Sequence, residues 1–93
     1  MARFTLHGPD GPKTFTLAGR PGWLLARLIE AGQTGLTAAD FAPGLRVAGF
    51  VHRIRQAGVP VETRYERHEG RFPGNHARYR LAAEVKPIEG GEE

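Results

Sequence analysis

The chain has no cysteine and no long hydrophobic segment. Without cysteine, neither disulfide bonds nor thiolate metal ligands can support the fold. The longest apolar cluster, residues 23–29, is interrupted by Arg27 and is far too short to span a bilayer. No apolar stretch typical of a secretion signal follows Met1. We therefore expect a cytoplasmic protein that does not associate with membranes.

The sequence also lacks the common motifs of enzymes and metal sites. It has no glycine-rich phosphate loop, no nucleophile elbow and no cluster of carboxylates. We therefore expect no enzymatic activity, no cofactor and no small-molecule substrate. Its four histidines are His7, His52, His68 and His76, and no two of them have the i, i+4 spacing of a helical pair. Because no cysteine can complete such a set, the sequence predicts no metal site.

Positive charge is concentrated in one segment. The 93 residues suffice for a single small domain and carry a net charge of only +3. Residues 46–80 hold eight arginines and three glutamates, a net charge of +5, whereas residues 81–93 have a net charge of −3. A genome-wide preference for arginine would explain why arginine outnumbers lysine, but not why the excess is local. The local excess is typical of a surface that binds a polyanion.

The N-terminal segment predicts a β-hairpin. Apolar and polar residues alternate over residues 3–7 and again over residues 13–17. Residues 8–12 between them are glycines, prolines and an aspartate, which favour a turn. We therefore expect residues 1–20 to form an N-terminal hairpin, which would either complete the sheet of this domain or contact a second copy.

A helix is expected over residues 21–31. Pro21 suits the first turn of a helix, because its missing N–H costs nothing there, and Gly32 suits the end. Trp23 falls on the other side of this helix and is expected to pack against the hairpin. The residues that the helix would bury are Leu24, Leu25, Leu28 and Ile29.

Two further helices are expected in the middle of the chain. Thr37 is a good N-cap for a short helix over residues 37–41, with Asp40 placed to complete a capping box. Another helix would begin near Leu45 and end at Gly58, so that the two form a helix-turn-helix unit. The apolar face of the longer helix consists of Val47, Phe50, Val51 and Ile54, with i, i+3, i+4, i+7 spacing.

A second hairpin follows this helix at once. Val59, Val61, Thr63 and Tyr65 would share one half-buried strand face, and Ala77, Tyr79 and Leu81 another, with a loop over residues 68–76. On the outer faces, Arg78 and Arg80 are expected to form cross-strand ion pairs with glutamates at least as readily as they would contact DNA. Residues 83–93 are polar and acidic and are expected to be a disordered tail, which leaves residues 21–82 as the main domain.

These elements predict an α+β fold, a winged helix-turn-helix with three helices, a C-terminal β-hairpin wing and an additional N-terminal hairpin. Four segments carry a further signal: Leu36 and Thr37, residues 51–58 (VHRIRQAG), residues 61–63 (VET) and residues 77–81 (ARYRL). Through them, residues 24–81 resemble a small winged-helix family found in uncharacterised phage, prophage and bacterial proteins. The resemblance implies DNA binding by the longer helix and the wing, and Phe50 departs from the family pattern.

The candidate DNA-binding residues lie on the longer helix and in the wing. Arginine pairs with guanine and glutamine with adenine in the major groove, and glycine allows a close approach. Arg55 lies at the flank of the helix, where a structural or a phosphate-binding role is expected. The wing loop, with Phe72, would lie along phosphates or pack back on the domain. The candidates are Arg46, Gly49, His52, Arg53, Gln56, Arg67, Arg71 and Asn75.

The favoured function is duplex DNA binding by a small transcriptional or phage-associated regulator. A homodimer or a protein partner remains open, because one module of this size binds DNA weakly. The alternative function is a protein–protein interaction module, such as a phage-type inhibitor or adaptor of a host protein. Trp23, Phe72 and the N-terminal hairpin would then supply the contacts, since aromatic side chains dominate many interfaces.

Overall fold

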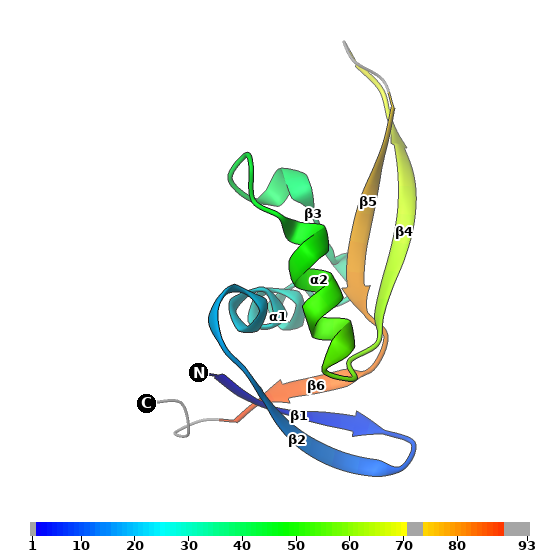
Figure 1. The fold of residues 1–93 in the computed structure, drawn as a ribbon. Helices are drawn as coiled ribbons and strands as arrows, with labels where there is room; N and C mark the ends of the chain where they lie inside the picture. Colours follow the sequence, from blue (N-terminus) through cyan, green and yellow to red (C-terminus); the bar gives the residue numbers. More distant parts are fainter. Residues whose placement is uncertain (1, 71–73, 89–93) are drawn as a thin grey trace.

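The computed structural model describes residues 2–70 and 74–88, and this part of the chain contains two α-helices and two three-stranded sheets (Figure 1). The elements in chain order are β1 (Ala2–Gly8), β2 (Gly11–Leu17), α1 (Gly19–Ala31), the 3₁₀ turn η1 (Gly32–Thr34), β3 (Leu36–Thr37), the 3₁₀ turn η2 (Ala38–Asp40), α2 (Val47–Gln56), β4 (Val61–His68), β5 (Gly74–Leu81) and β6 (Glu84–Pro87).

The expected N-terminal hairpin is present, but its sheet has a third strand. β1 pairs with β2 from Ala2 opposite Leu17 to Gly8 opposite Gly11. On its other edge β1 pairs antiparallel with β6, where Leu6 lies opposite Val85. The expectation of disorder from residue 83 is therefore wrong for β6, whose Val85 is buried (5% exposed) because the pairing places it against the core. Residues 89–93 lie outside the described part of the chain.

The second sheet has the order β3-β5-β4 and includes the expected second hairpin. β4 and β5 pair from Val61 opposite Leu81 to His68 opposite Gly74, so both strands extend further into the expected loop than alternation alone indicated. We call this hairpin, β4 with β5, the wing. Its inner face packs on the helices at the base only, so the expectation that Tyr65 is half-buried is wrong, since it is 76% exposed.

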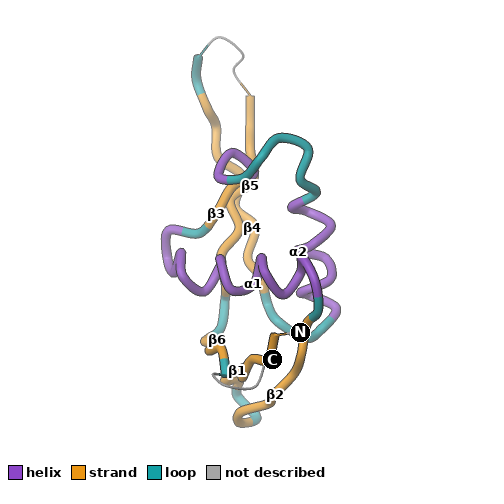
Figure 2. Tube along the Cα trace, turned by 90° about the vertical axis from the view of Figure 1, so that its left-hand side faces the viewer, coloured by secondary structure: helices purple, strands orange, loops and turns teal. Residues whose placement is uncertain are grey.

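Both helices pack on the same side of this second sheet (Figure 2). They bury apolar residues at the positions that the helical period predicts. Leu24, Leu25 and Leu28 of α1 are at most 1% exposed, and Ile29 is only partly buried. Gly32 and Gly58 end the two helices with positive φ, as expected from their lack of a side chain. In the described residues, neither helix is both long and apolar enough to cross a bilayer.

Three helices were expected, and the described residues contain two α-helices. The segment expected as a helix over residues 37–41 is the single turn η2, although the capping interaction is present: the Asp40 carboxylate accepts from the Thr37 N–H at 2.8 Å. Two features prevent a longer helix. Leu36 and Thr37 are paired with β5 as strand β3. Pro43, two residues after Phe41, cannot continue a helix.

Trp23 packs on Phe41, a contact that the sequence did not predict. Its ring meets Phe41 edge to face, with the ring centroids 5.5 Å apart, because Phe41 follows η2 and lies against α1. Trp23 remains 38% exposed, and the Arg20 guanidinium lies over its ring at 5.5 Å from the centroid. α1 thus presents an aromatic and cationic surface to solvent.

Two glycines in the helices provide a matched test of packing. A Cβ at Gly22 would lie 2.5 Å from the backbone oxygen of Leu17, which cannot move freely, whereas a Cβ at Gly49 would meet nothing closer than Arg46 Cβ at 3.9 Å. We expect Gly22→Ala to lower the free energy of unfolding by about 1–3 kcal/mol. We expect Gly49→Ala to raise it by about 0.5–1 kcal/mol. Urea unfolding measures both, and equal effects of the two substitutions would contradict the packing described.

Candidate nucleic-acid interface

The solvent-facing side of α2 carries four of the candidate residues. Val47, Val51 and Ile54 turn inward and are at most 4% exposed, so the 3.6-residue period turns the remaining positions outward. Arg46 is exposed at the N-cap position immediately before the helix. Phe50, the departure from the family pattern, is half-buried against the core. The exposed candidates within α2 are Gly49, His52, Arg53 and Gln56.

The charge of α2 is entirely positive. The helix contains no acidic residue, and Arg53 and Arg55 lie in its last turn. Cations at this end interact favourably with the helix dipole, so their presence has a structural reason as well as a functional one. Arg46 lies at the opposite end, where a cation gains nothing from the dipole. Its charge there is therefore the stronger indication of an anionic partner.

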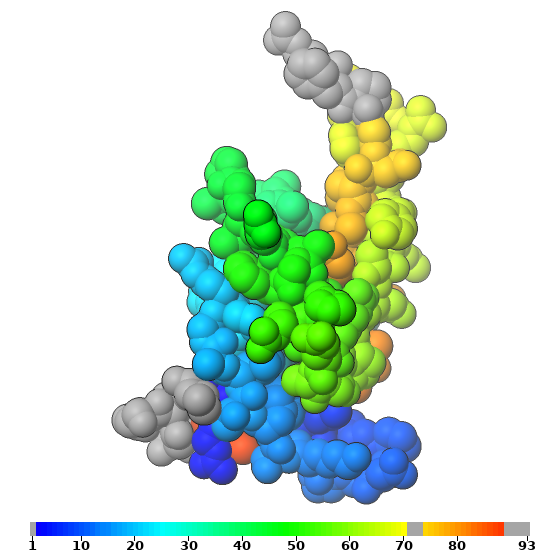
Figure 3. All heavy atoms as spheres, in the orientation of Figure 1, coloured from blue at the N-terminus to red at the C-terminus, as the bar shows by residue number. Residues whose placement is uncertain are grey.

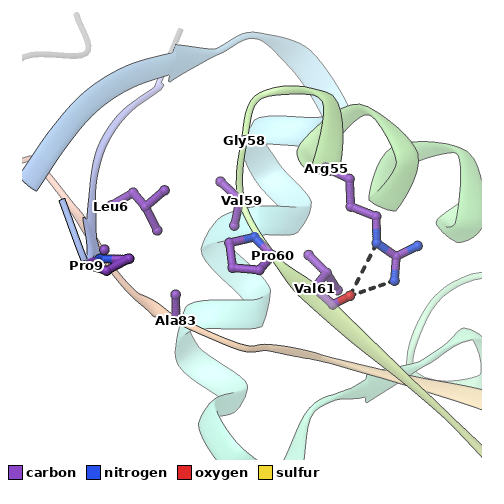
Figure 4. A pocket seen from close by; sticks show the side chains of 9 residues that line it. Leu6, Pro9, Arg55, Gly58, Val59, Pro60, Val61 and Ala83 are labelled. Atoms are coloured by element: carbon purple, nitrogen blue, oxygen red, sulfur yellow. Dashed lines mark hydrogen bonds between the residues drawn. The ribbon is translucent and has the colours of Figure 1, made fainter.

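Arg55 has a structural role, which leaves its guanidinium engaged within the protein (Figure 4). Nε and one terminal nitrogen donate to the Val61 carbonyl oxygen at 3.2 and 2.6 Å, and that terminal nitrogen also donates to Thr63 Oγ1 at 2.8 Å. These bonds join the last turn of α2 to the first residues of β4. Arg55 thereby sets the position of the wing relative to the helix.

A largely apolar hollow of ≈ 510 Å³ lies beside this junction, between the N-terminal sheet and the chain that leaves α2. Leu6 and Pro9 line one side, and Val59 and Pro60 line the other (Figure 4). The charged residue in its lining is Arg55, whose Nε and one terminal nitrogen already donate hydrogen bonds within the protein. The hollow therefore offers no obvious anchor for a polar ligand.

The wing extends as a narrow arm beyond the N-terminal end of α2 (Figures 1 and 3). Arg67 and Asn75 are direct cross-strand partners on this arm, and both are exposed. Arg67 lies 3.4 Å from the Glu69 carboxylate, but both side chains are more than three-quarters exposed, so the pair is weak. Arg71 and Phe72 lie outside the described residues. The wing candidates and the α2 candidates thus come from two separate elements.

An open groove of ≈ 490 Å³ lies between α2 and the wing. Arg46, immediately before α2, and Gly49 of α2 line one side, and Ala77 and Tyr79 of β5 line the other. The small residues Ala48, Gly49 and Ala77 keep this groove open, and Arg46 places a positive charge in its lining.

The opposite face of the wing carries the expected cross-strand ion pairs. Arg80 Nε lies 2.6 Å from Glu62, and Arg78 Nε lies 2.8 Å from Glu66. The same arginines reach η1, where Arg78 donates to the Thr34 carbonyl oxygen at 3.2 Å. The hydrogen bond from Arg78 lowers the pKa of Glu66 below its ordinary value of 4.5, and His76 lowers it further. These arginines are therefore partnered within the protein.

Sequence spacing missed one group of side chains. His68 and His76 come together on the outer face of the wing, with their Nδ1 atoms 3.0 Å apart, and His76 Nε2 lies 3.0 Å from Glu66 Oε1. Helical spacing cannot detect such a pair, because it forms across two strands. The hairpin register would have found it, since His76 lies opposite Glu66 and two residues away from the partner of His68. No group of three or more potential metal ligands occurs among the described residues.

Comparison with models of protein families identifies the family of this chain. Residues 14–91 match the model of a protein family described as "Winged helix domain". The matched segment begins within β2 and includes both helices, the wing and β6. No curated protein and no solved structure matches the chain.

Removing the Arg55 guanidinium tests the junction between α2 and the wing. We expect Arg55→Ala to lower the free energy of unfolding by about 1–3 kcal/mol, because the Val61 carbonyl loses charge-assisted hydrogen bonds. Arg55→Lys should recover only part of this loss, since one ammonium cannot reproduce the planar fork. Arg53→Ala, on the same exposed turn, is the control and should change stability little. An equal loss in Arg53→Ala would contradict the assigned role.

The Glu66 ion pair makes stability depend on pH. Because the pKa of Glu66 is lowered in the folded state, its contribution is fully present above the ordinary value of 4.5 and is lost as pH falls through the folded pKa. We expect Glu66→Gln to destabilise the protein by a constant amount above about pH 5.5, with the difference shrinking at lower pH. Urea unfolding of both proteins, above about pH 5.5 and at lower pH, measures this difference in the free energy of unfolding. Glu69→Gln, an exposed control, should show no such convergence.

Proposed function

The chain belongs to the winged helix domain family, and we propose on that basis that it binds duplex DNA, with α2 in the major groove and the wing on the phosphate backbone. Membership alone gives a DNA-binding fold and not an activity, since function resides in particular surfaces. The side chains of α2 and the wing therefore carry the proposal.

The exposed face of α2 is the observation that carries it. An α-helix with its side chains is about 10–12 Å across and fits the major groove, which is about 12 Å wide. Arg53 and Gln56 have the donors and acceptors that distinguish guanine and adenine. His52 adds a further side chain that can form hydrogen bonds. No acid on α2 opposes the approach of phosphates. Gly49 lets the helix backbone come close to the bases.

The wing would then contact the backbone beside the groove. Arg67 and Asn75 lie on its inner face, the same face that packs on the helices at the base, so they point toward the side from which α2 is exposed. Phosphate contacts of this kind position a protein on the duplex and carry no sequence information. Arg71 is proposed to join them. The sequence preference would reside in α2.

We further propose that the protein is a small cytoplasmic regulator, either transcriptional or phage-associated. A single helix and wing contact few base pairs, and regulators of this size gain specificity by pairing two half-sites. A homodimer on DNA is therefore the proposed assembly. The described residues form no recognisable catalytic constellation, and we assign the protein no enzymatic role.

One observation favours the alternative of a protein-binding module. Trp23 is exposed on α1 beside Phe41, and Arg20 and Arg27 lie over the two rings, at 5.5 and 6.0 Å from the centroids. Aromatic and arginine side chains are the commonest energetic centres of protein interfaces. This surface lies on α1 rather than on α2. Trp23→Ala therefore separates the two functions, since it should leave DNA affinity unchanged.

A salt series with random-sequence duplex DNA tests the DNA proposal. We expect binding that weakens linearly with the logarithm of salt concentration, because each phosphate contact releases counterions. Arg46→Ala/Arg53→Ala should weaken binding by about 1–3 kcal/mol for each arginine that contacts the duplex, and it should reduce the salt slope. Fluorescence anisotropy with a labelled duplex measures both quantities.

The matched control removes the same charge elsewhere. Arg3→Ala/Lys13→Ala deletes two exposed cations from the N-terminal sheet, away from α2 and the wing. It should leave the affinity within about twofold of the original at moderate salt, where distant charges are screened. Equal weakening by the two double variants would indicate a general charge effect. Absence of binding even at low salt would overturn the DNA proposal.

A further inference from the structure

The outer face of the wing brings two histidines and a glutamate together near the end of the described strands. His76 lies directly opposite Glu66, and His68 is two residues further along β4 on the same face. The imidazole rings are stacked, with their centroids 5.2 Å apart, and the two Nδ1 atoms are 3.0 Å from each other. This face is opposite to the one that carries Arg67 and Asn75. The cluster is therefore independent of the proposed DNA contacts.

The glutamate determines which nitrogen of His76 is available. Glu66 Oε1 lies 3.0 Å from His76 Nε2, and its other oxygen accepts from Arg78. A carboxylate can only accept hydrogen bonds, so the proton of neutral His76 resides on Nε2 and its Nδ1 carries a lone pair. A histidine held by a carboxylate in this way is the usual arrangement of a metal ligand. Without metal, the short Nδ1–Nδ1 contact requires His68 to donate the proton of its own Nδ1.

We propose that His68 and His76 together bind one divalent late transition-metal ion, Cu²⁺ in preference to Zn²⁺, through their Nδ1 atoms. The ion replaces the proton that the two nitrogens share, and this proton is released to solvent. Glu66 acts as a positioning residue that orients His76. Since no group of three ligands exists in the described residues, the remaining coordination positions are filled by water or by an incoming ligand.

The separation of the nitrogens selects the metal. A metal–imidazole bond is about 2.0 Å long. Two nitrogens 3.0 Å apart therefore subtend an angle of about 90° at the ion. This is the angle between neighbouring ligands in square-planar or octahedral geometry, which Cu²⁺ and Ni²⁺ favour, and it is well below the tetrahedral angle that Zn²⁺ favours. Cu²⁺ also binds nitrogen ligands more tightly than Zn²⁺ does.

Titration of the tag-free full chain with Cu²⁺ tests the site. We expect one Cu²⁺ per chain by calorimetry at pH 7.5, with an electron paramagnetic resonance spectrum that shows imidazole nitrogen coupling. Because chelation makes the second bond intramolecular, His68→Ala and His76→Ala should each lower the affinity about 100-fold.

Three further variants distinguish this site from others on the protein. His7→Ala and His52→Ala remove the remaining histidines and should leave Cu²⁺ affinity and spectrum unchanged. Glu66→Gln keeps both ligands and should lower the affinity about tenfold, as expected for a positioning residue. Each variant is first checked for cooperative unfolding. Loss of Cu²⁺ binding in His52→Ala, unchanged binding in His76→Ala, tighter binding of Zn²⁺ than of Cu²⁺, or no binding of one Cu²⁺ per chain would overturn the proposal.

Discussion

The Arg55 guanidinium determines how the two parts of the candidate interface are placed relative to each other. Only residues 57–60 separate α2 from β4, and a link this short would still leave the wing free to swing about Gly58. The hydrogen bonds from Arg55 to the Val61 carbonyl and to Thr63 remove this freedom at the base of the wing. Val59 and Val61 are buried at the same junction, so apolar packing and the hydrogen bonds of Arg55 both hold the base of the wing in place. The groove of ≈ 490 Å³ is lined by residues of α2 and of the wing, the two parts of the structure that this joint connects.

Sequence reasoning found the features that depend on local signals. The helical period predicted which residues of α1 and α2 are buried, glycines marked both helix ends, and alternation revealed both hairpins. It failed where distant pairing decides the structure. β6 has one buried apolar residue, Val85, and its partner strand lies about eighty residues earlier, so composition alone suggested a tail. η2 is a single turn because Leu36 and Thr37 pair with β5, which no local propensity predicts.

The candidate site was predictable in part for the same reason. Positions on α2 follow from the helical period, so the exposure of Arg46, His52, Arg53 and Gln56 agrees with expectation. Whether they contact DNA remains a prediction. The two faces of the wing differ in a way that only the strand register reveals: one carries Tyr65, Arg67 and Asn75, and the other carries ion pairs and the histidine pair. A shift of one residue would exchange these two sets.

The central position of β1, between β2 and β6, has a consequence for how the protein is made. The β1–β2 hairpin and the wing close over short stretches of chain, and such local pairings form early. β6 must instead close a loop from Phe4 to Pro87, which costs more entropy and comes late. During synthesis, β1 therefore leaves the ribosome with one edge unpaired until β6 has followed. An unpaired edge of this kind attracts other strands, so the nascent chain is most vulnerable to aggregation just before β6 is added.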